Sequence, residues 1–251
     1  MIRLVRSEWT KLLTTRVWLG LLVAACALAA GSTALLTAFA GDPQSGLPPV
    51  DSSRYEQLAL ATGADVVGLS LILGIIGTTQ EYRHRTATPT FLASPRRGRV
   101  VVAKLAAYAV AAVPFALAVV AVTLLVVVLH GGARGGELSW TAGNMEVLLR
   151  SGLAIVVYAI IGVGVGALLR NQVGAIVGAP VYLFVVEPVI RSIPATAPAY
   201  KWMPGGALEA MTATSQGPDL LQAWQGALVL LGYGLLAAVL GTAFAVRRDV
   251  V

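Results

Sequence analysis

Cysteine, histidine and charge are all scarce in this chain of 251 residues. It has a single cysteine, Cys26, and two histidines, His84 and His130. One cysteine cannot form an intramolecular disulfide, and no Cys/His spacing typical of a metal site occurs. The two histidines are far apart in the predicted topology, and neither has a convincing nucleophile or acidic partner. We therefore predict no catalytic residues and no metal site.

The scarcity of charge excludes an ordinary soluble domain. Charged residues make up 12% of the chain and hydrophobic residues 57%, with a mean hydropathy of +0.79. Soluble domains are usually about 25% charged and about 45 to 50% apolar. The apolar residues also come in blocks as long as a bilayer requires. We expect an all-α integral membrane protein in which residues 1–251 form a single transmembrane domain.

Six windows are long and apolar enough to cross a membrane as helices. Each has close to the roughly 20 residues that span the hydrocarbon core, and none has the ten-residue alternation of a membrane barrel strand. Within lipid, a helix satisfies all of its own backbone groups. The six predicted spans are about 17–40, 58–79, 105–129, 148–169, 173–190 and 225–246.

The first window also has some features of a cleaved secretory signal, including Ala38-Phe39-Ala40. However, sixteen residues precede an apolar stretch of 24, which is longer than the about 7 to 15 residues of a signal's apolar core. We interpret this window as a retained membrane anchor.

The basic residues predict the orientation. With the N-terminus inside, thirteen of the 18 lysines and arginines lie on the inner side and five on the outer side. Such a bias places both termini in the cytoplasm, where the basic residues contact anionic lipid headgroups. The net charge of +6 is thus explained by membrane lipids, and we expect no nucleic-acid partner.

Residues 2–13 form an amphipathic pattern. Ile2, Val5, Trp9, Leu12 and Leu13 share one helical face, with polar and basic residues largely opposite. This pattern predicts an interfacial elbow helix that lies along the membrane surface. The alternative is an ordinary basic flank of the first span.

The segment 80–104, between the second and third predicted spans, is basic and contains one apolar pair. Phe91 and Leu92 lie between Pro89 and Pro95, which can open and close a short helix. Such a helix would present the pair to another protein. A basic loop that lies on the lipid surface without a partner is the alternative.

Two stretches resemble a known family, the permease subunits of type 2 ABC exporters. One is Glu8-Trp9-Thr10-Lys11-Leu12 with Thr15-Arg16, and the other combines Glu81, Thr86, Phe91-Leu92, Ser94-Pro95-Arg96-Arg97 and Lys104. In topology the resemblance covers the whole chain. It implies a cytoplasmic coupling helix in the loop 80–104, and the coupling residues expected from it are Glu81, Arg83, Arg85, Thr88, Phe91, Leu92 and Pro95.

The resemblance also implies the partners and the location. Such permeases lie in the bacterial plasma membrane, pair with a second permease copy as a homodimer or with a related chain, and bind separate ABC ATPase subunits that hold ATP and Mg. This sequence has no Gly-x-x-x-x-Gly-Lys-[Ser/Thr] phosphate loop. We therefore expect a non-catalytic subunit without a cofactor of its own.

The segment after the fifth predicted span is broken by prolines at 188, 194, 198 and 204. Repeated prolines prevent one continuous helix. The resemblance implies short re-entrant helices before the last span, whereas the alternative is a plain extracellular loop with Trp202 as an aromatic anchor.

Two carboxylates, Asp65 and Glu187, fall within predicted spans. A charge at that depth costs a few kcal/mol unless it faces protein or water. We predict that both face the translocation path or the dimer seam, although Glu187 could instead mark the end of its helix beside Pro188. Gly174 and Gly178 have the spacing of a small-residue packing motif and are predicted to allow close helix packing, as are the glycines at 162, 164 and 166.

These patterns favour the permease subunit of an ATP-driven exporter. A secondary transporter or channel that does not use ATP is the alternative, but it usually shows ionisable residues in several spans and an internal repeat. A membrane scaffold that transports nothing is a third possibility.

Overall fold

The computed structural model describes residues 2–84, 97–212 and 220–247, and this part of the chain is helical throughout its regular structure. Five helical segments are long and apolar enough to span a membrane: Val17–Phe39, Ser53–Arg83, Gly98–Gly131, Ala142–Leu169 and Gln172–Ser192. The all-α prediction is confirmed, and the chain is a multi-pass membrane protein by the length and composition of these helices.

The predicted sixth span, 225–246, lies within α12 (Ala223–Arg247), of which the continuously described part, Ala223–Ala237, is apolar. Six spans therefore stay a prediction.

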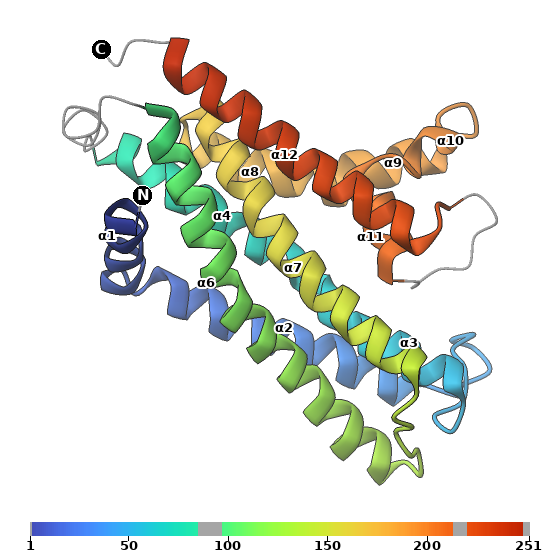
Figure 1. Ribbon diagram of the computed structural model, residues 1–251. Helices are drawn as coiled ribbons and strands as arrows, with labels where there is room; N and C mark the ends of the chain where they lie inside the picture. Colours follow the sequence, from blue (N-terminus) through green and yellow to red (C-terminus); the bar gives the residue numbers. More distant parts are fainter. Residues whose placement is uncertain (1, 85–96, 213–219, 248–251) are drawn as a thin grey trace.

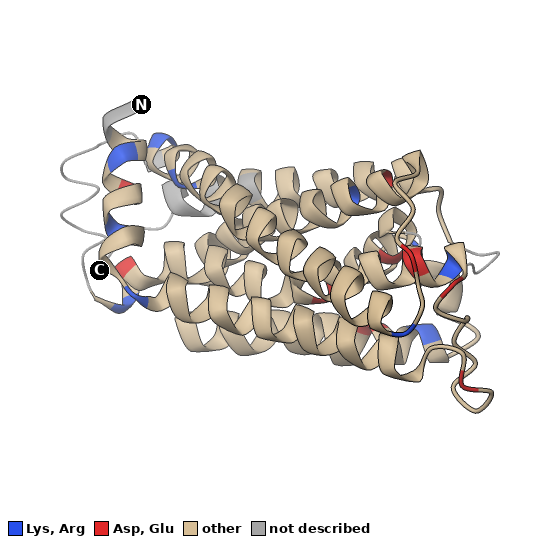
Figure 2. Cartoon of the chain, turned by 90° about the horizontal axis from the view of Figure 1, so that it is seen from below, with Lys and Arg blue, Asp and Glu red and all other residues tan. Residues whose placement is uncertain are grey.

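A long central helix, α7 (Ala142–Leu169), organises the bundle. It packs against α4 (Val67–Arg83), α6 (Arg97–Val126) and α12, and α2 (Val17–Phe39) covers α6 from the other side. Figure 1 shows these helices running together along one direction. Lysine, arginine, aspartate and glutamate residues lie mainly at the two ends of the bundle, and few lie between them (Figure 2).

The second span is broken into three parts. Ser52 caps α3 (Ser53–Ala61) by accepting a hydrogen bond from the Tyr55 N–H at 3.2 Å, and a 3-10 turn, η1 (Thr62–Val66), joins α3 to α4. The Thr33 and Thr62 hydroxyls meet at 2.7 Å, and those of Thr37 and Tyr55 meet at 2.8 Å. These bonds hold the broken region against α2.

The fifth span is also irregular. Arg170 adopts a left-handed conformation with φ of 53° and ends α7, and Asn171 then caps α8 (Gln172–Val181) by accepting from the Gly174 N–H at 3.1 Å. A π-helical turn, η3 (Tyr182–Val186), follows Pro180 and leads into α9 (Glu187–Ser192). A similar turn, η2 (Val127–Gly131), ends the third span.

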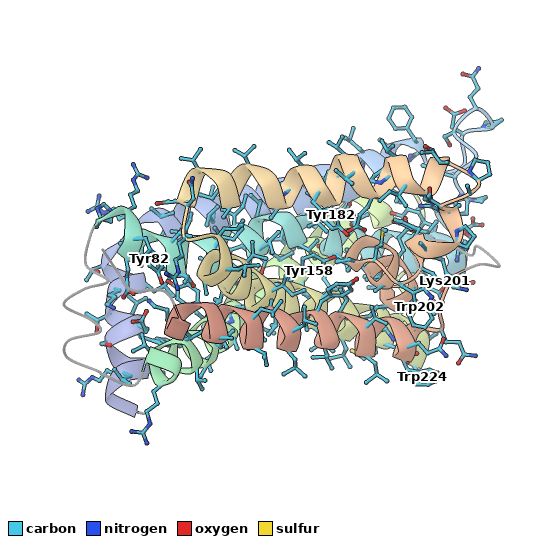
Figure 3. The ribbon with its side chains drawn as sticks, turned by 90° about the horizontal axis from the view of Figure 1, so that it is seen from above. Tyr82, Tyr158, Tyr182, Lys201, Trp202 and Trp224 are labelled. Atoms are coloured by element: carbon cyan, nitrogen blue, oxygen red, sulfur yellow. The ribbon has the colours of Figure 1, made fainter. Side chains whose placement is uncertain are left out.

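Two short helices, α10 (Ala197–Tyr200) and α11 (Pro204–Thr212), occupy the proline-rich segment, and α11 packs against α12 and α7. The prediction of short helices before the last span is confirmed; their re-entry into a membrane stays a prediction. Lys201, Trp202 and Trp224 lie at the end of the bundle opposite Tyr82 (Figure 3).

At the other end, α1 (Ile2–Thr14) crosses the bundle at a steep angle to the spans (Figures 1 and 2). Val5, Trp9 and Leu12 pack against the core. A helix therefore forms where the amphipathic pattern predicted one, and its apolar face meets protein; contact with a membrane surface stays a prediction. We call this end, which carries both termini, the α1 end, and the opposite one the α3 end.

Helices extend into both ends of the predicted loop 80–104. Helix α4 continues to Arg83 and α6 begins at Arg97, so Glu81 and Lys104 lie within helices. The physical reason is that both charges are paired inside the fold, and hydropathy alone takes a charge as the end of a span.

Candidate functional site

Four charged side chains form a cluster at the α1 end. The Lys104 ammonium donates to Glu8 at 2.7 Å and lies 3.1 Å from Glu81, and Lys11 donates to Glu8 at 2.8 Å and to Glu81 at 2.5 Å. We call Glu8, Lys11, Glu81 and Lys104 the ionic cluster. It joins α1 to the last turn of α4 and to the third turn of α6.

Three of the four side chains of the ionic cluster are buried, Lys11 is partly exposed, and the four charges balance. Glu8, Glu81 and Lys104 are 3%, 4% and 2% exposed. The Lys104 ammonium donates hydrogen bonds to Glu8 and, at 3.2 Å, to the Gly77 carbonyl, and it forms an ion pair with Glu81. A buried charge is tolerated when it is paired and hydrogen-bonded in this way.

Burial lowers the pKa of Lys11, but its hydrogen bonds and charge attraction to Glu8 and Glu81 outweigh that effect and leave the pKa above its usual value. Lys11 therefore stays charged at neutral pH and bridges the two carboxylates. No cluster of His, Cys, Asp or Glu in the described ranges could hold a metal ion.

The ionic cluster lies beside both ends of the segment predicted to bind an ATPase. Glu81 is two residues before the end of α4 at Arg83, and Lys104 is about two turns after the start of α6 at Arg97. Of the predicted coupling residues, Glu81 is buried in the cluster and Arg83 is exposed. The other five lie outside the described residues: Arg85, Thr88, Phe91, Leu92 and Pro95.

Glu187, the first of the two predicted membrane carboxylates, is fully buried below α11. Its Oε2 accepts a hydrogen bond from the Gly205 N–H at 2.7 Å, and within the described part its Oε1 has no hydrogen-bond partner. The Tyr158 hydroxyl donates to the Pro204 carbonyl at 2.9 Å in the same region. Glu187 therefore fixes the first turn of α11 on the fifth span.

Asp65, the second carboxylate, lies in the 3-10 turn of the second span with an exposed side chain. It borders a cavity of about 340 Å³ between η1, η3 and α11, which Phe184, Leu208 and Glu209 also line. Asp65 and Glu187 thus approach α11 from two different spans. Whether they face a transport path or a second copy stays a prediction.

The glycines of the fourth span allow close packing, as predicted. A Cβ on Gly162 would lie 2.1 Å from the Leu71 carbonyl oxygen, and one on Gly164 would lie 2.4 Å from the Ala237 Cβ. A Cβ on Gly178 would have nothing within 4 Å and one on Gly174 would meet the capping side chain of Asn171, so the packing role of these two glycines stays a prediction. They lie on α8, which buries few of its residues.

Sequence reasoning missed the pairing of the ionic cluster. Glu8, Lys11 and Lys104 were noted only in the two stretches that carry the family resemblance. The only sequence pattern that could have indicated the pairing is that two acidic and two basic residues flank long apolar blocks. A sequence gives no distance between segments 70 or more residues apart, so the pairing itself could not be predicted. It also missed Glu56, which is buried at the α3 end and accepts from the Ser139 hydroxyl at 3.0 Å and from Asn144.

No protein-family model matches the sequence, and no curated protein matches it significantly. The comparisons therefore identify no family, and the resemblance to exporter permeases depends on the residues given above.

Proposed function

We propose that this chain is the permease subunit of an ATP-driven ABC exporter of the bacterial plasma membrane, with both termini cytoplasmic. The observation that carries the proposal is the ionic cluster, which ties α1 to both helices that flank segment 85–96. A buried group of opposite charges is a rigid connection, since separating its members leaves an unpaired charge in the protein.

In this proposal an ABC ATPase binds segment 85–96 through Phe91 and Leu92. ATP, with Mg, is bound and hydrolysed in that partner, and its closure moves the segment. Glu81 and Lys104 then pass the displacement to α1 and to the spans together, because neither helix end can move without its partner in the ionic cluster.

The substrate path is placed between the second and fifth spans. Asp65 and the cavity of about 340 Å³ lie there, and a second permease copy would close the path from the other side. Glu187 holds α11 over the α3 end of this region. Movement of the spans would open or close this end by shifting η1 and η3 relative to α11.

The test is co-expression with a phosphate-loop ATPase encoded beside this gene. We expect the two proteins to co-purify from membranes and to hydrolyse ATP together. Phe91→Asp should abolish co-purification while the protein still inserts, because a charge replaces the apolar contact. Phe39→Asp is the matched control. Phe39 is exposed and ends α2 at the α3 end, away from segment 85–96, so this substitution should leave the complex intact.

Persistence of the complex in Phe91→Asp, or loss of it in both variants, would reject this docking site. Failure of any such ATPase to bind the native chain would reject the exporter assignment itself.

One observation favours a second function, a transporter or channel driven by an ion gradient. Asp65 is exposed within a span, and an ionisable residue at that depth is often part of an ion pathway. Proteoliposomes that contain the chain alone distinguish the two functions. Ion or solute flux under a pH gradient without ATP would support this alternative and contradict the exporter proposal.

A further inference from the structure

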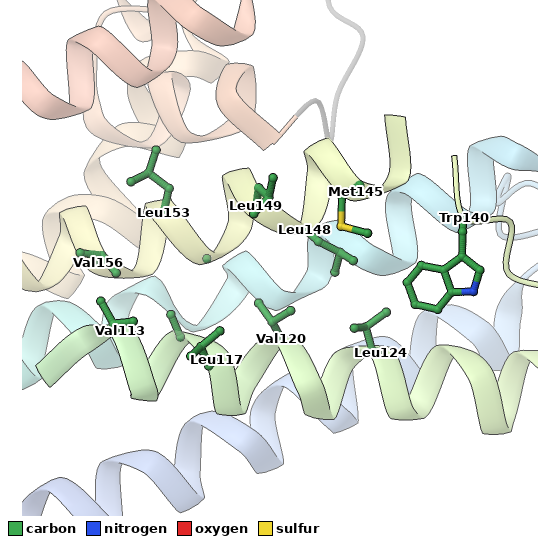
Figure 4. A pocket seen from close by; sticks show the side chains of 12 residues that line it. Val113, Leu117, Val120, Leu124, Trp140, Met145, Leu148, Leu149, Leu153 and Val156 are labelled. Atoms are coloured by element: carbon green, nitrogen blue, oxygen red, sulfur yellow. The ribbon is translucent and has the colours of Figure 1, made fainter. Parts of the chain in front are cut away.

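A groove of about 570 Å³ lies between α6 and α7. Its walls are apolar side chains from the two helices, and Trp140 from the loop that joins them closes one end (Figure 4). The lining residues used below are Val113, Leu117 and Leu124 of α6 and Leu149, Gly152 and Val156 of α7. We call this cavity the lateral groove.

The lateral groove is open on its side. Leu117 and Leu149 are 64% and 68% exposed, and Trp140 is 69% exposed. Both walls belong to helices that are long and apolar enough to span a membrane, so the open side faces hydrocarbon and not water. A cavity without polar groups would stay dry in any case.

The length of the lateral groove matches one leaflet. From Val113 to Leu124 the axis of α6 rises about 16 Å, at about 1.5 Å per residue. One leaflet is half of a hydrocarbon core that is roughly 30 Å thick. Figure 4 shows Val113 and Val156 at one end of the row of side chains and Trp140 at the other.

Trp140 lies at the end where a lipid headgroup would be. Tryptophan is enriched at the membrane interface, because its ring is apolar and its indole N–H can donate a hydrogen bond. Here it precedes Thr141, which caps the start of α7, so it stands at the edge of the span and not within it. Its N–H can reach ester or phosphate oxygens at that depth.

From these observations we infer that the lateral groove binds one acyl chain of a phospholipid from the leaflet at the α3 end. The chain lies along α6 and α7 with its headgroup beside Trp140. Because the groove is bounded on both sides by packed helices, this lipid exchanges more slowly than the lipids around the rest of the bundle. The site is separate from the ionic cluster and does not depend on the proposed transport function.

Gly152 makes the lateral groove testable. A Cβ at this position would meet only the Val120 side chain, at 3.8 Å, so a large side chain there would project into the groove without striking the backbone. Gly152→Phe should therefore occupy the space of the acyl chain. Gly232→Phe is the matched control, because a Cβ on Gly232 of α12 has nothing within 4 Å and lies away from the groove.

The experiment uses vesicles of phosphatidylethanolamine and phosphatidylglycerol that contain a phosphatidylcholine with a diazirine in its acyl chain. The reconstituted protein is extracted into detergent, washed free of loose lipid and then irradiated, and the labelled peptides are mapped by mass spectrometry. We expect labelling of Leu117 and Leu149 several-fold above that of Leu235 and Val239, which are equally exposed on α12. Gly152→Phe should lower the labelling several-fold, and Gly232→Phe should not.

Equal labelling of the groove residues Leu117 and Leu149 and of the α12 residues Leu235 and Val239 in the native protein would overturn the inference. Unchanged labelling of the groove in Gly152→Phe would overturn it as well. A further outcome is that a second copy fills the groove. In that case Leu117→Cys, in a chain with Cys26→Ala, would form disulfide-linked dimers, and the lipid assignment would be wrong.

Discussion

At the scale of single residues, Lys104 is the most buried member of the ionic cluster. Its ammonium group is buried and neutralises Glu8 and Glu81 together with Lys11. We predict that Lys104→Met lowers the free energy of unfolding by about 3 to 5 kcal/mol, because removal of one partner leaves a buried charge uncompensated. Thermal unfolding in detergent measures the change.

Arg99→Met is the control for this loss. Arg99 is an exposed basic residue on the same helix, and its substitution should change stability little. Equal effects of the two variants would show that the loss in Lys104→Met does not come from the ionic cluster.

The pKa of Lys11 gives a prediction of pH dependence. Its pKa in the folded protein is raised above the ordinary lysine value of 10.5, so its pairs with Glu8 and Glu81 contribute fully below about that pH. The contribution disappears as the pH rises through the higher pKa of the folded state. Lys11→Met should be less stable at neutral pH and should lose less additional stability above pH 10.5.

Melting curves of the native protein and of Lys11→Met at neutral and alkaline pH test this prediction. The other lysines and the tyrosines titrate in both proteins, so the difference between the two proteins reports on Lys11 alone. A constant difference between the two proteins across this range would contradict it.

At the scale of the helices, α4 and α7 approach so closely that glycine is required between them. A Cβ on Gly74 would lie 2.0 Å from the Ala159 carbonyl oxygen, which is backbone and cannot turn away. Gly74→Ala should therefore separate the helices and cost about 1 to 3 kcal/mol, as overpacking usually does. Gly178→Ala is the control, because nothing lies within 4 Å of its Cβ.

Chemical or thermal unfolding of both variants gives the comparison. Native stability in Gly74→Ala would show that α4 and α7 can move apart at no cost in the free energy of unfolding. A larger loss of stability in Gly178→Ala than in Gly74→Ala would mean that α8 packs against another molecule.

The helices themselves were largely predictable from sequence, because long apolar blocks have few alternatives in lipid. The fourth span was predicted as 148–169 and extends over Ala142–Leu169, since Thr141 caps its start and accepts from the Asn144 N–H. The ends of α4 and α6 were not predictable. Glu81 and Lys104 continue these helices because each finds a partner across the fold, and composition contains no information on such pairs.

The candidate site divides in the same way. Asp65 and Glu187 were identifiable because a carboxylate in an apolar block is costly. That Glu187 binds the first turn of α11 was not, since it requires the path of the chain through η3 and the proline-rich segment. The role of Gly74 was likewise hidden, because a glycine in a span could as well face lipid.

At the scale of the whole molecule, the fifth span has too little protein around it. In its most apolar part 11% of residues are buried, against 78% in the second span. Val177 and Val173 are among its exposed side chains. The span is irregular, and it flanks the cavity that contains Asp65. For the permease dimer proposed above, we therefore expect the second copy to pack on α8.

Cysteine cross-linking tests this assembly. In a chain with Cys26→Ala, Val177→Cys should form dimers on oxidation in membranes, because symmetry brings equivalent positions of a shared interface together. Val239→Cys, equally apolar and exposed on α12, should stay monomeric. Dimers through Val239 alone would place the second copy on the wrong face and remove Asp65 from the proposed path, whereas monomers in both variants would leave α8 in contact with lipid and contradict a permease dimer built on this span.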